Sequence, residues 1–279
     1  MTATKSKLEA GSANDGLGKK LLILIVNNKG GVGKSVVARA LVDNYRTVGK
    51  VAHIYDTDGG TGSLLISYGT RDEKGALLKD QDPAVGIGYF DIRGEKSRNK
   101  LLDNLASGAP IIVCDMAGGS LNEISRIVDD GDGFDGFVEA VAELGYELVI
   151  LNVLSNVQGA TTSVRDYLNA FNGSAKHVAI INKTWGKSEE DFPFWYGYKT
   201  KKGEERGGKT RADFLAAGGR EIHFPAMPHG TFALVDAAQM SFAAAAHDED
   251  LTVTETQHVK KFNKEASAAF LEIKDALGL

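Results

Sequence analysis

Short apolar runs alternate along this chain with stretches of helical periodicity. The runs are continuous instead of alternating with polar residues, which is typical of strands buried on both faces of a parallel sheet. The clear runs are Leu21–Val26, Val51–Tyr55, Pro110–Cys114, Leu148–Val153 and His177–Ile181, with a weaker one at Glu221–Phe224 and a further candidate at Val85–Ile92. The pattern predicts a buried and largely parallel sheet.

Helical spacing fills the intervals between these runs. The stretch Ser35–Val48 places Val37, Leu41 and Tyr45 four residues apart, and Gly49 provides a natural stop. Further candidate helices are Lys100–Ala106, Leu121–Val128, Phe137–Leu144 and Gly159–Phe171, followed by closing helices at Ala237–Ala246 and Thr254–Leu277. The alternation of strand and helix predicts an α/β fold with a doubly wound, mostly parallel sheet.

The pattern also predicts how the chain is divided. Residues 1–19 are small and polar, so we expect a disordered tail there. Residues 20–279 contain no internal repeat and no low-complexity linker, so we expect one domain with a basic and aromatic insertion near 185–211. The apolar stripe of the last candidate helix favours core packing over attachment to a membrane.

Composition narrows the chemistry. Hydrophobic residues make up 43% of the chain and charged residues 25%, as in globular proteins, and the net charge is −5. The single cysteine, Cys114, excludes an intramolecular disulfide framework, a cysteine-ligated zinc site and an iron–sulfur cluster held by this chain alone. The sequence has neither an apolar run long enough to span a membrane nor a signal peptide, so we expect a cytoplasmic protein.

Glycine is enriched, at 33 of 279 residues, and a dense cluster follows the first apolar run in the sequence NNKGGVGKSVV. These glycines lie between a predicted strand and a predicted helix, where positive φ and close approach bring backbone amides to an anion. The helix N-terminus adds to the preference for phosphate. The predicted phosphate-binding residues are Gly30, Gly31, Val32, Gly33, Lys34, Ser35 and Val36.

Two side chains of this loop and three carboxylates complete the candidate site. Lys34 is placed to reach the β- and γ-phosphates of a nucleotide, and the Ser35 hydroxyl to ligate Mg²⁺. Asp56 and Asp58 follow the second apolar run, and Asp115 follows the third. Doubly wound folds bind ligands at the carboxyl ends of their strands, so we expect these carboxylates beside the glycine loop. An apolar strand that ends in aspartate is typical of a carboxylate that holds Mg²⁺ through a water.

The segment KGGVGKS resembles the deviant Walker A signature of the ParA/MinD family of P-loop ATPases. The resemblance covers most of the chain, from about Leu21 to Ala246. It implies a homodimer bridged by ATP, in which Lys29 reaches across to the phosphates bound by the partner subunit. The catalytic set that it implies is Lys29, Lys34 and Asp58.

Two further motifs carry the resemblance. DTDGG resembles the first switch region of the family, which implies that Asp58 orients the attacking water and that Asp56 lies near Mg²⁺, together with Ser35 and Asp115. The family continues this motif with Pro-Gln where the present chain has two glycines. The sequence CDMAGGS resembles the second switch region but carries Met-Ala-Gly-Gly where the family often has prolines.

The resemblance also implies where the nucleotide base binds. Asn182 follows the run His177–Ile181, where the family places an asparagine that reads the adenine edge. Pro225 matches the strand–proline turn whose backbone lines the base pocket in that family. The sequence NKTW lacks the aspartate of the guanine-reading NKxD motif, which favours ATP over GTP.

Two segments stand out by charge. Residues 123–147 hold eight acids and one base, and we expect an acidic surface there. Residues 196–211 hold six bases and two acids and overlap the aromatic sequence FPFWYGY; we favour a solvated loop, with non-specific DNA binding as the alternative. The bases in question are Lys199, Lys201, Lys202, Arg206, Lys209 and Arg211. For Arg93, farther upstream, we favour a surface ion pair over a switch or substrate contact.

These motifs support one leading hypothesis and two alternatives. The leading hypothesis is a slow ATPase that dimerises on ATP and partitions or positions DNA or another large cargo, with an unidentified partner protein that stimulates hydrolysis. One alternative is a metabolic P-loop synthetase that uses ATP to activate a carboxylate, with Phe192–Tyr198 in its substrate pocket. The other is a nucleotide-gated interaction protein of a conjugation or secretion system, which the missing Pro-Gln keeps open.

Overall fold

Seven parallel strands form the central sheet of the computed structural model, which describes residues 19–171 and 173–279. The strands are β1 (Lys20–Val26), β2 (His53–Asp56), β3 (Gly88–Tyr89), β4 (Ile111–Asp115), β5 (Tyr146–Leu154), β6 (Lys176–Asn182) and β9 (Arg220–Phe224). Their order across the sheet is β3-β2-β4-β1-β5-β6-β9. The doubly wound parallel sheet predicted from the apolar runs is confirmed. The predicted tail lies outside the described residues, apart from residue 19.

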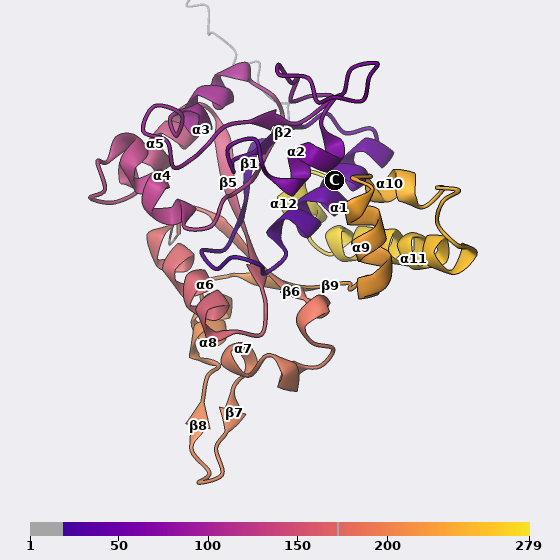
Figure 1. The fold of residues 1–279 in the computed structure, drawn as a ribbon. Coiled ribbons are helices and arrows are strands. Elements are labelled where there is room, and N and C mark those ends of the chain that lie inside the picture. Colours follow the sequence, from indigo (N-terminus) through magenta and orange to yellow (C-terminus); the bar gives the residue numbers. More distant parts are fainter. Residues whose placement is uncertain (1–18, 172) are drawn as a thin grey trace, which may run out of the picture.

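Helices cover both faces of the sheet (Figure 1). They are α1 (Lys34–Thr47), α2 (Ser63–Tyr68), α3 (Lys100–Asp103), α4 (Ser120–Val128), α5 (Asp135–Glu143), α6 (Gln158–Ala170), α7 (Pro193–Tyr196), α8 (Lys209–Ala216), α9 (His229–Ala237), α10 (Phe242–Ala245), α11 (Val253–Leu271) and α12 (Lys274–Leu277). In β1, Ile23 and Ile25 join an apolar cluster with α1 and α11, whereas Leu22 and Leu24 join another with α3, α4 and α5. Burial on both faces explains why this apolar run is continuous.

Several predicted elements differ from the observed ones. The candidate strand Val85–Ile92 is reduced to the two residues of β3. The predicted helix Ala237–Ala246 is wrong, because α9 ends at Ala237, Gln239 takes a positive φ of 53° and α10 begins at Phe242. The last predicted helix is divided into α11 and α12. Within the residues described, no helix has both the length and the apolar character needed to cross a membrane.

The strand order places the candidate site at the carboxyl ends of the central strands. β1 lies between β4 and β5, and the chain passes from β1 to β2 on one side but enters β5 and β6 on the other. The order therefore reverses beside β1, and loops that leave neighbouring strands in opposite directions open a crevice there. The loops after β1, β2, β4 and β6 carry the sequence motifs described above.

A hairpin projects from the body of the protein between β6 and α8 (Figure 1). It consists of β7 (Tyr198–Lys199) and β8 (Glu205–Arg206), which pair antiparallel. We call residues 198–206 the arm. Phe192 and Trp195, which precede it, are buried in the core. The substrate pocket that the synthetase hypothesis placed there therefore gains no support from these two aromatic residues.

Candidate nucleotide-binding site

A glycine loop joins β1 to α1. Gly31 and Gly33 take positive φ values of 75° and 102°, and Gly33 is the N-cap of α1. A Cβ at Gly33 would collide with the side-chain amide nitrogen of Asn182, whereas a Cβ at Gly30 or Gly31 would meet open space. The loop is therefore open over its first two glycines and tightly packed at the third, an arrangement that suits close approach of an anion to the backbone.

Asn27, which is buried at the end of β1, anchors this loop. Its side-chain amide nitrogen donates to the carbonyl oxygens of Val153 (2.9 Å) and Ala160 (3.0 Å), at the end of β5 and in α6. Its Oδ1 accepts from the backbone amide of Lys29 (2.8 Å). Sequence reasoning missed Asn27, because only the fold shows that its partners lie more than a hundred residues away.

The two lysines of the loop lie in different environments. Lys34 is partly buried, and its Nζ donates to the carbonyl oxygen of Asn27 (3.1 Å). Burial lowers the pKa of Lys34, and the carboxylates of Asp115 and Asp58 oppose this shift. Lys29 is exposed. One lysine therefore faces the carboxylates of its own chain, and the other is accessible to a second molecule.

Asp115 ends β4 with its side chain buried beside the glycine loop. Burial raises its pKa to about 7 and the charge of Asp56 adds to the rise, while a hydrogen bond from Ser35 and the charge of Lys34 oppose it. Within the described part of the chain, its Oδ1 has no hydrogen-bond partner. A buried carboxylate oxygen without a donor, next to a serine hydroxyl, fits the oxygen ligands that Mg²⁺ prefers.

Asp56 holds the loop that follows β2. Its Oδ1 accepts from the backbone amide of Asp58 (3.0 Å), and its Oδ2 accepts from that of Leu65 (3.2 Å) in the first turn of α2. Burial raises its pKa, and these amide hydrogen bonds oppose the rise. In the ranges that the structure covers, no three acidic, histidine or cysteine side chains converge to hold a metal. The place of Asp56 near Mg²⁺ therefore stays a prediction.

The loops after β2 and β4 are joined through Thr57, which is fully buried. Its backbone amide and its hydroxyl each donate to the carbonyl oxygen of Asp115 (3.1 Å), and its hydroxyl oxygen accepts from the amide of Ala117 (2.9 Å). Asp58 is more open, with 47% of its side chain exposed, and its carboxylate pairs with Arg93 (2.6 Å). The ion pair expected for Arg93 is thus confirmed, and it engages the predicted catalytic carboxylate.

A largely apolar cavity of about 240 Å³ lies beside the glycine loop and the end of β6. It is lined by Gly31, Gly33, Val36, Asn182, Thr184, Trp185, Met227, His229, Phe232 and Phe262. The Val32 carbonyl oxygen, in the loop itself, accepts from the Asn182 amide (2.9 Å) and from the Trp185 indole (3.2 Å). A concave apolar site with a few polar groups, next to a phosphate-binding loop, suits a nucleotide base.

The structure brings one of the two predicted base-binding residues to this cavity. Asn182 lines it, but its amide nitrogen holds Val32 and its Oδ1 accepts from the Thr184 amide (3.1 Å), so the side chain also fixes the loop. Pro225 lines a different hollow. Met227, two residues farther on, lines the base cavity instead, as does Trp185. Sequence reasoning gave neither residue a role, although Trp185 is the last residue of the NKTW segment that begins at Asn182.

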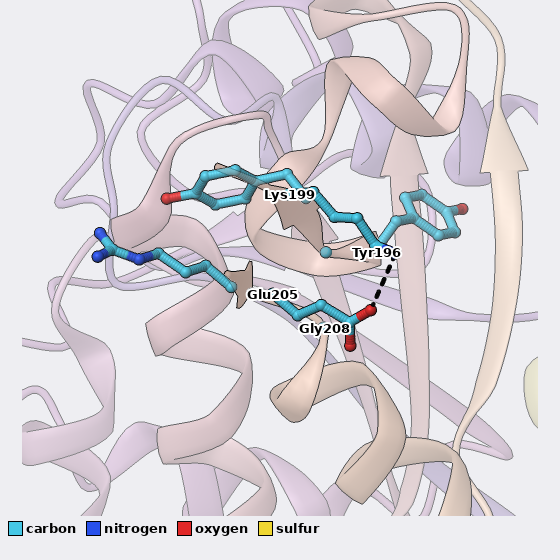
Figure 2. A pocket seen from close by; sticks show the side chains of 8 residues that line it. Tyr196, Lys199, Glu205 and Gly208 are labelled. Atoms are coloured by element: carbon cyan, nitrogen blue, oxygen red, sulfur yellow. Dashed lines mark ion pairs between the residues drawn. The ribbon is translucent and has the colours of Figure 1, made fainter. Parts of the chain in front are cut away.

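Four of the six bases singled out near the arm are neutralised by acidic neighbours. Lys199 pairs with Glu205 (3.3 Å) across the hollow at the base of the arm, whose volume is about 410 Å³ (Figure 2). The other three pairs are Arg206–Glu204 (2.9 Å), Lys209–Asp213 (2.9 Å) and Arg211–Glu221 (2.8 Å). Lys201 and Lys202, in the turn of the arm, make no ion pair with any residue that the structure describes.

Comparison with curated proteins finds two informative relatives, and no protein-family model matches. The chain is similar to protein MobD of Acidithiobacillus ferrooxidans, with 24% identity over 196 residues, which cover 68% of this chain and 76% of MobD. It is also similar to the flagellum site-determining protein YlxH of Helicobacter pylori, with 25% identity over 157 residues. That match covers 56% of this chain and 47% of YlxH, so the chain spans about half the length of this relative.

Solved structures of similar fold include the cell-division ATPase MinD of Pyrococcus furiosus, with a TM-score of 0.49 and 14% identity over 89% of this chain and 98% of that one. They also include a ParA-family ATPase of Chlorobium tepidum, with a TM-score of 0.48 and 12% identity over 88% and 98%. The parallel sheet and the glycine loop between β1 and α1 define the P-loop NTPase fold. Within that class, the resemblance to the ParA/MinD family predicted from KGGVGKS is confirmed.

Proposed function

We propose that this chain is an ATPase that binds ATP and Mg²⁺ at the glycine loop, dimerises on ATP, and hydrolyses it slowly to partition or position a large cargo. The observation that carries the proposal is the convergence of three motifs at the carboxyl ends of neighbouring strands. These are the glycine loop after β1, Asp58 after β2, and the unpartnered buried oxygen of Asp115 after β4. Similarity to a flagellum site-determining protein supports the positioning role.

Each part of the site has a separate task in this proposal. The amides of the glycine loop and the ammonium group of Lys34 bind the phosphates and stabilise the charge that develops during transfer. Ser35 and Asp115 hold Mg²⁺, which supplies further neutralisation of the phosphate oxygens when it is bound. Asp58 accepts a hydrogen bond from the attacking water and orients it. The cavity beside Trp185 receives the base.

Dimerisation is proposed from the position of Lys29. This side chain is exposed, forms no ion pair within the described residues, and belongs to the glycine loop itself. An exposed cation at the rim of a phosphate site can neutralise charge on a nucleotide held by a facing subunit. ATP bound between two subunits then stabilises the dimer, and loss of the γ-phosphate releases it.

The arm is proposed as the segment that contacts DNA. DNA is one cargo that the positive charge of the arm favours. After ion pairing, the free positive charge of this segment resides on Lys201 and Lys202, at the projecting turn. Two lysines make only a small number of phosphate contacts, so we expect weak binding with a shallow dependence on salt. This contact is much smaller than the six-base patch considered from the sequence.

The proposal is tested by the rate of phosphate release from ATP, with and without plasmid-length DNA. We expect slow release that needs Lys34, is lost in Lys34→Ala, and rises when DNA is added. The rise should disappear in the double variant with Lys201→Ala and Lys202→Ala. It should persist in Lys199→Ala, the matched control, because Glu205 already neutralises that lysine.

Two results would favour the alternatives. A metabolic synthetase would transfer phosphate from ATP to a small carboxylate and release it when a nucleophile attacks the acyl phosphate, so phosphate release would depend on that carboxylate and not on DNA. A nucleotide-gated interaction protein would bind ATP and dimerise without measurable phosphate release. An ATP turnover that is independent of Lys34 contradicts the proposed site itself.

A further inference from the structure

The loop after β3 packs directly against the loop that carries Asp58. The Gly59 amide donates to the Phe90 carbonyl oxygen (3.2 Å), and the Ile92 amide donates to that of Thr57 (3.1 Å). These bonds place Asp58 opposite Asp91 in an antiparallel bridge outside the main sheet. We call residues 90–98 the post-β3 loop.

The bridge sets two like charges side by side, and one cation joins them. Directly opposed carboxylates repel each other. Arg93 donates from Nη2 to Oδ1 of Asp58 (2.6 Å) and from Nε to Oδ1 of Asp91 (3.0 Å). Asp91 also accepts from the Arg93 backbone amide (3.0 Å), which fixes the start of the arginine side chain. The planar guanidinium therefore sets both the position and the orientation of the Asp58 carboxylate.

The post-β3 loop is anchored at its other end to α4, the helix that follows β4. Arg98 pairs with Glu123 of α4 at 2.9 Å, and both side chains are largely buried. Within the loop, the Ser97 hydroxyl donates to the Asp91 carbonyl oxygen (2.6 Å). Arg93 thus extends from a segment that is held at both ends, and it is not a free surface side chain.

Among the described residues, Arg93 is the only side chain that hydrogen-bonds to the carboxylate of Asp58. It occupies Oδ1, and no described residue donates to Oδ2. A carboxylate held through one oxygen, with the other free to accept from a water, is in the arrangement that orienting a nucleophile requires. Asp58 is also close enough to Lys34 and Asp115 to act on the charge of both.

We propose that Arg93 is a positioning residue for ATP hydrolysis, which fixes the Asp58 carboxylate in the orientation that aligns the attacking water. The inference rests on the proposed function, which assigns that task to Asp58. It goes further by naming a residue outside every motif of the resemblance. Because Arg93 and Asp58 are about half exposed, their pair contributes little to stability, and Arg93→Gln should fold.

Steady-state hydrolysis by the full chain tests this inference. Arg93→Gln should lower kcat at least about tenfold and change KM for ATP by less than about twofold, as expected when orientation and not binding is lost. Arg93→Lys should recover part of kcat, because an ammonium group still contacts Asp58 but lacks the planar fork. In an Asp58→Asn background, Arg93→Gln should cause no further loss.

Arg220→Gln is the matched control. Arg220 also forms a 2.6 Å ion pair and is similarly exposed. It lies at the start of β9, the strand at one margin of the sheet, and so at the amino ends of the strands and away from the candidate site. A kcat of Arg93→Gln that equals or exceeds the wild-type value, or an equal loss in Arg220→Gln, would overturn the inference and leave the proposed function intact. Absence of Lys34-dependent hydrolysis in the wild type would instead overturn the proposed function, and this inference with it.

Discussion

The three glycines of the phosphate-binding loop can be required for two reasons, a positive φ or a lack of space for a Cβ. Alanine substitution separates these two requirements, which the sequence alone does not distinguish. Gly30 has open space around it and no positive φ, Gly31 has open space but a φ of 75°, and Gly33 combines a φ of 102° with close packing against Asn182. We expect the free energy of unfolding to fall in the order Gly30→Ala, Gly31→Ala, Gly33→Ala, with the last the least stable.

The magnitudes follow from the backbone and one contact. Holding an L-residue at left-handed φ costs roughly 1–2 kcal/mol, so Gly31→Ala should lose about 1 kcal/mol. Gly33→Ala carries the same strain and must also displace Asn182 from Val32, a hydrogen bond that contributes about 1 kcal/mol net. Its total loss should therefore be about 2–3 kcal/mol. Gly30→Ala should lose nothing, because restricting the unfolded chain offsets any small cost.

Urea unfolding of the three variants measures these differences. In an Asn182→Ala background the collision at Gly33 is removed, so the cost of Gly33→Ala should fall to that of Gly31→Ala. Equal losses in all three single variants would refute this explanation. So would a cost of Gly33→Ala that does not depend on Asn182.

Three further predictions concern the loops after β2 and β4 and the cavity beside Trp185. The pKa of Asp115 is raised to about 7 in the folded protein, against ~3.9 in the unfolded chain, so this carboxyl stabilises the fold at low pH and loses that contribution as the pH rises from about 4 to about 7. Asp115→Asn should therefore flatten the decline in unfolding free energy over this pH range. Urea titrations at several pH values test this. Thr57→Val leaves the buried Ala117 amide without its acceptor and should cost roughly 1–3 kcal/mol in the same assay. Nucleotide should change the tryptophan emission of the wild type but not of Trp185→Phe, because Trp195, the other tryptophan, is buried in the core away from the cavity.

The strands and the phosphate loop were predictable because their signals are local. A continuous apolar run such as Leu21–Val26 can be satisfied only by burial on both faces, and three glycines before a lysine leave few alternatives to an anion-binding turn. The post-β3 loop was not predictable in this way. Its short strand pairs over two residues, and the rest of the loop is held by Arg93 and Arg98, which bind partners in other elements.

Residues that act through distant neighbours were missed for the same reason. Asn27 and Thr57 look unremarkable in sequence, and their roles appear only when β5 and β4 lie beside them. The basic segment shows the opposite error, because a count of basic residues overstates the number that are free of ion pairs. Glu221 neutralises Arg211 from β9, ten residues beyond the segment's last base.

The mass of the Asp58→Ala variant in the presence of ATP and Mg²⁺ tests the central claim most directly. Removing the water-orienting carboxylate should block hydrolysis and trap the nucleotide between two subunits, so light scattering should report twice the 29.7 kDa of one chain. Lys29→Ala should remain a single chain under the same conditions. A trapped variant that stays monomeric with ATP bound, while the wild type hydrolyses ATP as a monomer, would contradict the account.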